Sequence, residues 1–328
     1  MKKNVKINGC LYYRNFGEHP PILELKLGES LLPLIQKEER GALLLIELQN
    51  CRKYFDDEYG LIIPKIEVSF NENLQATEYS FFLNAVELER AQVNPEGMDG
   101  RAPEVIIKEH IQRLLRKNIT RILNQSLVIE NINRARNVNP DIIDNLLFTN
   151  NYPVENLRKI FNTLLEENVS IIDMSSILET IDDWKQVIRG EPRPSVLVEK
   201  IREKLSLGIL FKCADKEKVV HGILLNEDVT QLLQKKISCL AFGDKPYFEL
   251  DSAERKRVLD KVIKAAEDFI KKGFYPLVFL CPQTIRYEFS CFLQNYFEDF
   301  LCISEMELGA AKNQYTFQKE GEITFEER

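Results

Sequence analysis

The chain has 328 residues, of which 44% are hydrophobic and 29% charged, and its formal net charge is −7. This composition is that of an ordinary globular protein with two or three domains. The acidic balance argues against general nucleic-acid binding, because contact with phosphates needs a basic surface that releases counterions. No apolar run approaches the roughly 20 residues of a membrane helix, and no apolar stretch follows the first lysines, as it would in a signal peptide. We therefore expect a cytoplasmic protein.

The sequence carries few signals for catalysis or metal binding. Its seven cysteines include no C-x-x-C pair, which predicts buried thiols in a reducing compartment rather than disulfides or a zinc site. The histidines, His19, His110 and His221, are scattered along the chain. The phosphate-loop, dinucleotide, zinc-protease and serine-hydrolase motifs are all absent. We expect no cofactor, no metal and no catalytic residues.

The first twenty residues are polar and end in a proline pair, so we interpret residues 1–20 as a linker arm. Three aromatic residues, Tyr12, Tyr13 and Phe16, lie within five positions of this arm. Such clusters are costly to leave in water and are typical anchors of an interface. We expect them at a contact between subunits. The alternatives are a disordered arm and an arm folded back on its own domain.

Residues 21–102 combine strand and helix patterns and predict a small α/β domain. The expected strands are 22–27, 61–70 and 77–88, and the expected helices are 31–35 and 42–59. Gly28 ends the first strand, and Gly60 is placed to end the longer helix. Residues 94–102 are rich in glycine and proline and predict a domain boundary.

Residues 103–190 show only helical periodicity and predict a central helical domain. The expected helices are 105–123, 128–136, 141–148, 153–167 and 170–187. Asn168 suits a left-handed turn at the end of a helix. Ser170 and Asp173 have the spacing of a capping box that would start the next helix at Ser170, with Val169 and Met174 as its hydrophobic staple.

Residues 191–328 predict a C-terminal α/β domain. Strands are expected at 219–225, 276–281 and 300–304, with a helix over 282–296 that makes the last two strands a βαβ unit. The charged tail from Lys319 is expected to fray. The fold class is thus α+β and multidomain, with an α/β, a helical and a second α/β domain.

Two other functional interpretations arise from these elements. Cys281 ends a predicted strand just before a helix and would be a nucleophile if its pKa were lowered there, but burial as a small apolar residue is the expected role. Residues 153–187 have the outline of a helix-turn-helix. The second helix carries Asp173, Glu179 and Asp182 instead of the basic residues that a DNA recognition helix needs.

Several segments resemble one protein family in the same order along the chain. VSIIDMSSILETI at 169–181 resembles VSIRDMRTILETL of the FHIPEP family, the large export-gate proteins of bacterial flagellar and virulence type III secretion. Ile172 stands where that motif has arginine. LELKLGESLLPLI at 23–35, CRKYFDDEYGLIIP at 51–64 and SEMEL at 304–308 also resemble family segments.

The resemblance implies a platform that docks export substrates, their chaperones and the ATPase complex, without enzymatic activity. It implies assembly into a ring of nine at the cytoplasmic face of the inner membrane, beneath a membrane region that this chain lacks. Tyr12 and Tyr13 are then the nearest candidates for a contact that closes the ring.

A few dozen residues of the family's second small domain, which forms part of the chaperone cleft, are missing between the strand 77–88 and residue 103. We therefore expect weak or no chaperone binding, with any residual site on Phe81, Phe82 and Leu83. The alternative function is a soluble adaptor that keeps the ring-forming domains and lacks chaperone docking.

Overall fold

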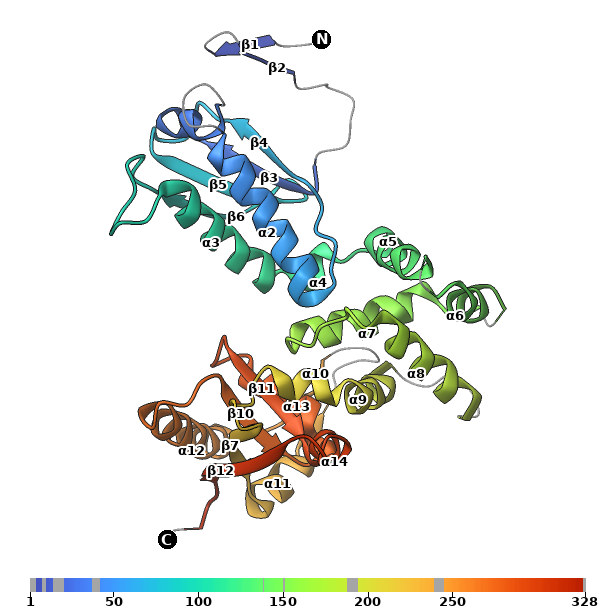
Figure 1. The fold of residues 1–328 in the computed structure, drawn as a ribbon. Coiled ribbons are helices and arrows are strands. Elements are labelled where there is room, and N and C mark those ends of the chain that lie inside the picture. The colour runs from blue at the N-terminus through green and yellow to red at the C-terminus, as the bar shows by residue number, and fades with distance from the viewer. Residues whose placement is uncertain are drawn as a thin grey trace. The chain divides into compact units, whose positions relative to one another are not determined.

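A computed structural model describes residues 4–7, 10–13, 21–36, 42–137, 139–149, 151–187, 194–238 and 245–326. The chain divides into two compact units, residues 1–134 and 135–328 (Figure 1). Both units combine helices with a four-stranded sheet, which confirms the predicted α+β, multidomain class. No helix in the described ranges has both the length and the apolar character needed to cross a bilayer.

The sheet of the first unit has the strand order β4-β3-β5-β6. Its strands are β3 (Leu23–Leu27), β4 (Ile66–Phe70), β5 (Glu78–Leu83) and β6 (Val86–Gln92). β3 pairs in parallel with β4 and antiparallel with β5. The parallel pair is possible because helix α2 (Leu43–Tyr59) forms the crossover between them. Alternate residues of β3 and β5 are buried against the helices, which places the core on one face of the sheet.

The predicted strand over 77–88 is in fact a hairpin, β5 and β6, so that prediction is wrong in its extent. Asn84 and Ala85 form the two-residue turn with φ of 48° and 65°, and Leu83 pairs with Val86 across it. Two positive φ values are the signature of a tight hairpin turn. The signal was missed because alanine rarely adopts this conformation, whereas Asn-Gly would have predicted the turn.

Gly28 lies where two backbone segments approach closely. A Cβ at this position would lie 2.1 Å from the carbonyl oxygen of Gln75 and 2.8 Å from that of Ala76. The Gly28 amide donates to Glu78 at 2.8 Å, and the Ser30 amide donates to Ala76 at 2.9 Å. The short 3-10 helix η1 (Glu29–Ile35), predicted as an ordinary helix over 31–35, begins from this contact. Glycine is therefore required by space rather than by its φ of −73°.

Helices α3 (Pro103–Lys117), α4 (Ile119–Ile122) and most of α5 (Gln125–Arg136) belong to the first unit. The predicted helix over 105–123 breaks at Asn118, which separates α3 from α4. Asn131 accepts from the amide of Ile62 at 3.2 Å, and Arg134 donates to the carbonyl oxygen of Gly60 at 2.7 Å. These bonds attach α5 to the end of α2, whereas the sequence grouped 103–190 into one helical domain.

The second unit begins with α6 (Pro140–Asp144), the π-helical turn η2 (Asn145–Thr149), α7 (Val154–Glu166) and α8 (Met174–Val187). Asn168 has a φ of 59°, and the Val169 amide donates back to Leu164 at 2.8 Å. This is the left-handed helix end predicted for Asn168.

The predicted capping box at Ser170 and Asp173 is wrong. Helix α8 begins at Met174, and Asp173 is its cap, accepting from the amide of Ser176 at 3.1 Å. Ser170 instead accepts from the amide of Ile172 at 3.3 Å, within the turn. Ile171 is fully buried, so we attribute the late helix start to the burial of this side chain. Met174 therefore occupies the first helical position and not that of a staple.

We expect Asp173→Ala to lower the free energy of unfolding by about 1 kcal/mol through loss of this cap. Ser170→Ala should cost clearly less, because its hydroxyl bonds only within a turn that leads into the helix. Urea unfolding of both variants beside the parent protein measures the difference. Equal losses of stability, or a larger loss for Ser170→Ala, would show that the helix starts at Ser170.

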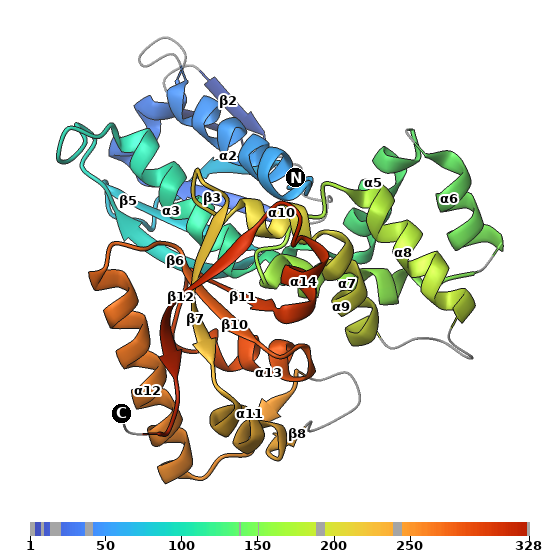
Figure 2. The same ribbon diagram turned by 60° about the horizontal axis from the view of Figure 1, so that its bottom comes forward.

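The sheet of the second unit has the order β11-β10-β7-β12, with all strands parallel (Figure 2). The strands are β7 (Val219–Leu225), β10 (Leu277–Cys281), β11 (Phe300–Ser304) and β12 (Thr316–Ile323). β10, helix α13 (Gln283–Leu293) and β11 form the predicted βαβ unit. Helices α11 (Glu227–Gln234), α12 (Ser252–Lys271) and α13 share one buried core with the strands.

The remaining elements of this unit are α9 (Pro194–Lys204), α10 (Ser206–Phe211) and α14 (Glu305–Ala310), with a short ladder of β8 (Ile237–Ser238) and β9 (Tyr247–Phe248). The expectation of a frayed tail from Lys319 is wrong, because this segment continues β12 along β7. An edge strand tolerates charged side chains, since one of its sides faces solvent.

His221 on β7 is held by acidic groups from two neighbouring elements. Its Nδ1 lies 2.9 Å from a Glu320 oxygen on β12, and its Nε2 lies 3.1 Å from Asp215 in the preceding turn. Phe274 stacks on the ring at 4.4 Å, and Lys272 lies 3.6 Å from Glu320. Burial lowers the pKa of His221, but the two carboxylates outweigh this effect and raise it above its ordinary value.

A raised histidine pKa means that this contact stabilises the fold most fully below the unfolded-state pKa of about 6.5 and loses its effect as the pH rises through the folded-state pKa. We therefore expect His221→Gln to lower the melting temperature more at pH 6 than at pH 8.5. Thermal melts of variant and parent at both pH values measure this. Equal differences at both pH values would contradict the assignment of charge to His221.

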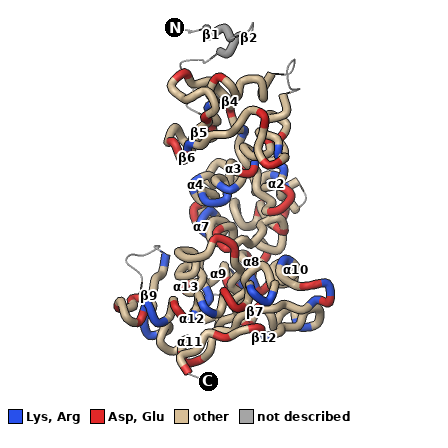
Figure 3. The backbone as a smooth tube through the Cα atoms, turned by 90° about the vertical axis from the view of Figure 1, so that its left-hand side faces the viewer, with Lys and Arg blue, Asp and Glu red and all other residues tan. Residues whose placement is uncertain are grey.

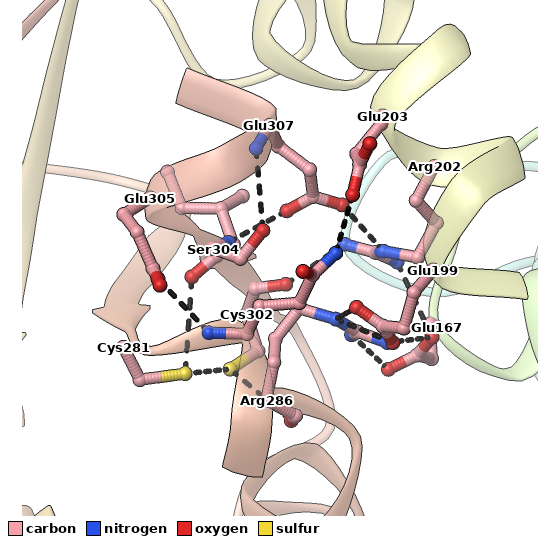
Figure 4. A network of polar contacts seen from close by, with 12 residues as sticks. Glu167, Glu199, Arg202, Glu203, Cys281, Arg286, Cys302, Ser304, Glu305 and Glu307 are labelled. Carbon is pink, nitrogen blue, oxygen red and sulfur yellow. Dashed lines mark hydrogen bonds and ion pairs between the residues drawn. The ribbon is translucent and has the colours of Figure 1, made fainter. Parts of the chain in front are cut away.

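A buried cluster of charged side chains joins four helices of the second unit (Figure 4). Arg202 on α9 and Arg286 on α13 are both 0% exposed. The Arg286 guanidinium donates to both oxygens of Glu167, which follows α7, and its Nε donates to Glu199 on α9 at 3.0 Å. Arg202 donates to Glu167 at 3.3 Å and also to Glu307 on α14.

The two arginines of this cluster share three glutamate partners, and Glu167 contacts both of them. Burial raises the pKa of Glu167, yet Arg286 and Arg202 outweigh it and hold the pKa below the ordinary glutamate value. Arg202 also donates to the backbone oxygen of Cys302 at 2.8 Å, which ties the cluster to the sheet. The cluster fixes the end of α7 against α9, α13 and α14. It is a structural network, because its donors and acceptors are occupied by one another.

Candidate docking site

A hollow of about 390 Å³ lies between the hairpin β5–β6 and helix α3 of the first unit. Its lining combines apolar and charged side chains: Tyr79, Glu89, Ala91, Arg101, Ile106, Glu109, His110, Arg113, Leu114 and Lys117. Tyr79 and Leu114 are buried, whereas Arg113 and Lys117 are exposed. The hollow thus has an apolar base and a charged rim.

A chain of hydrogen bonds runs from the base to the rim. The Tyr79 hydroxyl lies 2.8 Å from Nδ1 of His110, and Nε2 of His110 lies 3.2 Å from an oxygen of Glu89. Burial, with a smaller contribution from Glu89, raises the pKa of Tyr79 to about 12, so its hydroxyl keeps its proton. A carboxylate only accepts, so in neutral His110 the Nε2–H donates to Glu89 and Nδ1 accepts from Tyr79.

The rim carries both signs of charge. Arg101 contacts Glu109 at 3.3 Å, and Arg113 and Lys117 follow on the same side of α3, one turn apart. The end of α3 and helix α4 form a basic segment of the unit (Figure 3). This lining suits an apolar side chain of a partner with a charged flank. In the described part of the chain no group of histidine, cysteine and acidic side chains could hold a metal ion.

The predicted partner residues are only partly available. Phe81 and Leu83 are 0% and 1% exposed and lie in the core, so they cannot meet a partner in the folded protein. Phe82 points to the other face of the sheet, half-buried, with Nζ of Lys26 at 4.0 Å from its ring centre. The residue of this strand that reaches the hollow is Tyr79. Sequence analysis missed it, although an aromatic side chain with a polar tip at a buried strand position is a usable signal.

The predicted subunit contacts lie in the N-terminal arm. Tyr12 and Tyr13 belong to β2 (Cys10–Tyr13), which pairs antiparallel with β1 (Asn4–Ile7), so this part of the arm forms a hairpin. Phe16 lies outside the described residues. The role of the three aromatic residues at an interface stays a prediction.

Cys281, which ends the buried strand β10, is a poor nucleophile. Cys281 is 1% exposed, and its Sγ lies 3.5 Å from Sγ of Cys302 on β11. Burial raises the pKa of Cys281, and the neighbouring Cys302 raises it further. A reactive cysteine needs the opposite, an accessible sulfur with a lowered pKa. The prediction of buried thiols is confirmed for Cys51, Cys281 and Cys302.

The FHIPEP family model matches residues 18–104 and 89–313, which together cover most of the chain. The chain belongs to the FHIPEP family. Among its curated relatives, the flagellar biosynthesis protein FlhA of Treponema pallidum is 26% identical over 347 residues, covering 93% of this chain and 48% of the relative. FlhA of Helicobacter pylori is 22% identical, with 44% of that protein covered. This FHIPEP-family chain therefore spans about half the length of the curated relatives it matches.

Solved structures share the fold of this FHIPEP-family chain. The Chlamydia pneumoniae CdsV protein has a TM-score of 0.77 at 20% identity, covering 94% of this chain and 99% of that chain. The nonameric SctV-C of EPEC has a TM-score of 0.75 at 16% identity, covering 94% of this chain and 100% of that chain. A further similar structure is a complex of CdsV with CdsO from Chlamydia pneumoniae. These likenesses confirm the multidomain α+β architecture.

Proposed function

We propose that this chain is a component of a type III protein export apparatus, flagellar or virulence-associated, and acts as a docking platform on its cytoplasmic side. The family match over residues 18–313 carries this proposal. The nonameric SctV-C and the CdsV–CdsO complex support ring assembly and partner docking as properties of chains with this fold. Export substrates, their chaperones and the ATPase complex are the proposed partners.

We place the residual docking site for a chaperone or substrate at the hollow beside α3. Its apolar base, with Tyr79 and Leu114, would receive an apolar side chain, while Arg113 and Lys117 would meet an acidic flank. The residues between β6 and α3 are few, 93–102, so only a narrow wall adjoins the hollow on that side. We expect binding at this site to be weak for that reason.

The second candidate is a soluble adaptor that assembles with ring components and binds no export chaperone. The short connection from β6 to α3 is the observation that favours it, because little chain is present to build a second wall of a chaperone cleft. The two candidates differ in one measurable property, the affinity for a purified chaperone–substrate complex.

Calorimetric titration with purified export chaperones of the same organism, alone and carrying substrate, separates the candidates. The platform predicts measurable binding that weakens about tenfold or more with Arg113→Glu and Lys117→Glu together, a loss of about 1.4 kcal/mol. Lys53→Glu, an exposed lysine on α2, is the matched control. Absence of binding in the parent protein, with ring assembly intact, would favour the adaptor.

Ring assembly is tested separately by sedimentation at high protein concentration, with and without residues 1–20. We expect weak self-association that depends on the arm and on Tyr12, Tyr13 and Phe16. Head-to-tail contacts of one kind close into a ring when the rotation between subunits allows it. A protein that stays monomeric under both conditions would remove this role from the arm.

A further inference from the structure

Two short helices of the second unit, α10 and α14, lie side by side (Figure 2), and each exposes large apolar side chains. The exposed fractions are 43% for Leu207 and 75% for Phe211 on α10, and 45% for Met306 on α14. Gly208 on α10 and Gly309 and Ala310 on α14 are exposed as well. Leu207 and Phe211 are four residues apart and lie on one side of α10. Met306 and Gly309 are three residues apart and lie on one side of α14. We name these six residues the α10–α14 face.

The apolar residues of this face are additional to those that hold the two helices in place. Ile209 and Leu210 of α10 are buried, and so is Glu307 of α14, which forms the capping box with Ser304 and contacts Arg202. The inward sides of both helices are therefore already packed. Clustered apolar side chains left outside a packed core mark an interaction surface.

The two glycines of the face also indicate an interaction surface. Gly208 and Gly309 lie inside helices, where glycine is less favourable than alanine. A Cβ at either position would meet no described atom of this chain within 4 Å, and neither glycine has a positive φ. Neither packing within the described chain nor backbone geometry accounts for them. The close approach of another backbone would.

Size and charge decide what covers the face. Three large side chains offer much less than the roughly 800 Å² that each partner buries in a stable interface between two proteins, so a single helix fits better than a second copy of the chain. Lys204, Lys212 and Lys312 flank the face at the ends of α9, α10 and α14 and are exposed. The acidic Glu305 accepts from the backbone amide of Gln283 in the first turn of α13. With three lysines against this one glutamate, the flanks are predominantly basic.

We propose that the α10–α14 face docks an acidic amphipathic helix of a partner protein. The apolar stripe of that helix packs on Leu207, Phe211 and Met306, its backbone passes close to Gly208 and Gly309, and its carboxylates meet the flanking lysines. This docking does not depend on the hollow beside α3, which belongs to the other unit.

The probe is a stapled 18-residue helical peptide with leucines on one face and glutamates beside them. Two control peptides carry lysines in place of the glutamates, or serines in place of the leucines. Fluorescence anisotropy with the full chain should show saturable binding of the acidic peptide, and about tenfold or weaker binding of both controls. Equal binding of the acidic and basic peptides would overturn the proposal.

Variants then locate the site. Phe211→Ala should weaken binding of the acidic peptide about tenfold or more, whereas Ile270→Ala, at an exposed position of α12, should leave it unchanged. Gly208→Ala and Gly309→Ala should raise the melting temperature and still weaken binding, since the new methyl group stabilises the helix and blocks close approach. A loss of binding in these variants cannot be attributed to unfolding.

Two results would overturn the assignment. Unchanged peptide affinity in Phe211→Ala and in both glycine variants would place the peptide elsewhere. Concentration-dependent self-association that Phe211→Ala abolishes in sedimentation would show that a second copy of the chain covers this face.

Discussion

Replacing Arg286 with methionine will lower the free energy of unfolding by about 3–5 kcal/mol, because the substitution leaves the buried carboxylate of Glu167 and the partly buried one of Glu199 without this partner. Arg286 is 0% exposed and donates to both Glu167 and Glu199. Methionine fills a similar volume but cannot compensate their charge. The remaining arginine, Arg202, contacts Glu167 through a single bond of 3.3 Å and cannot replace the lost pair.

Urea unfolding of Arg286→Met beside the parent protein measures this loss. Lys271→Met, at an exposed position of α12 with only surface ion pairs, is the matched control and should change stability by less than about 1 kcal/mol. Adding Glu167→Gln to Arg286→Met should recover part of the loss, since it removes one uncompensated charge. A loss below about 1 kcal/mol in Arg286→Met would show that water reaches the cluster.

The same cluster predicts an acid sensitivity with a definite sign. Since the folded-state pKa of Glu167 is depressed, its contribution is present above the unfolded-state value near 4.3 and is lost as the pH falls through the folded-state pKa. Stability of the second unit should therefore decline on acidification, while the His221 contact is lost in the opposite direction, as pH rises.

The features set by local sequence were predictable. The βαβ unit of β10, α13 and β11 follows from two short, mainly apolar strands around a helical pattern, and the turn at Asn168 follows from the backbone freedom of asparagine. The buried charge cluster was not predictable. Arg202 and Arg286 lie 84 positions apart within helices of mixed composition, where a charged side chain normally marks the solvated face. Only the packing of four helices brings their partners to them.

The candidate docking site also depends on packing that the sequence of its strand does not reveal. Strand alternation correctly places β5 in a sheet, but it does not state which of its two faces meets the helices. Phe81 and Leu83 share the buried face with Tyr79, so the choice of this strand's apolar residues as partner contacts selected two core residues. Tyr79 reaches the hollow because its hydroxyl extends beyond the core to His110. That reach depends on α3, which the strand's own sequence does not contain.

The position of Asp173 as the cap of α8 illustrates competition between local signals. Ser170 and Asp173 both carry side chains that can cap a helix. The buried side chain of Ile171 holds the chain outside the helix for three further residues, so tertiary packing selects the later cap. The sequence pattern alone cannot show which of these two residues caps the helix.

The second large effect is expected at Gly28, where a methyl group would meet two carbonyl oxygens of the chain itself. Gly28→Ala should lower the free energy of unfolding by about 3 kcal/mol. Moving the two backbone segments apart costs roughly 1–3 kcal/mol through overpacking, and each displaced backbone bond adds about 1 kcal/mol. The displaced bonds are those from Gly28 to Glu78 and from Ser30 to Ala76. Because the obstructing atoms, 2.1 and 2.8 Å from the new Cβ, belong to backbone, rotation of a side chain cannot relieve the contact.

Urea unfolding of Gly28→Ala measures this loss, and Gly309→Ala is its matched control, because a Cβ at Gly309 meets nothing within 4 Å. The same chemical change should then act with opposite signs, strongly destabilising at Gly28 and mildly stabilising in helix α14. Hydrogen exchange should locate the loss at Gly28 in the amides of Gly28 and Ser30, whose bonds join β3 and η1 to the segment before β5. If Gly28→Ala stays within about 0.5 kcal/mol of the parent protein, residues 74–77 move aside freely, and the close approach is not what requires glycine there.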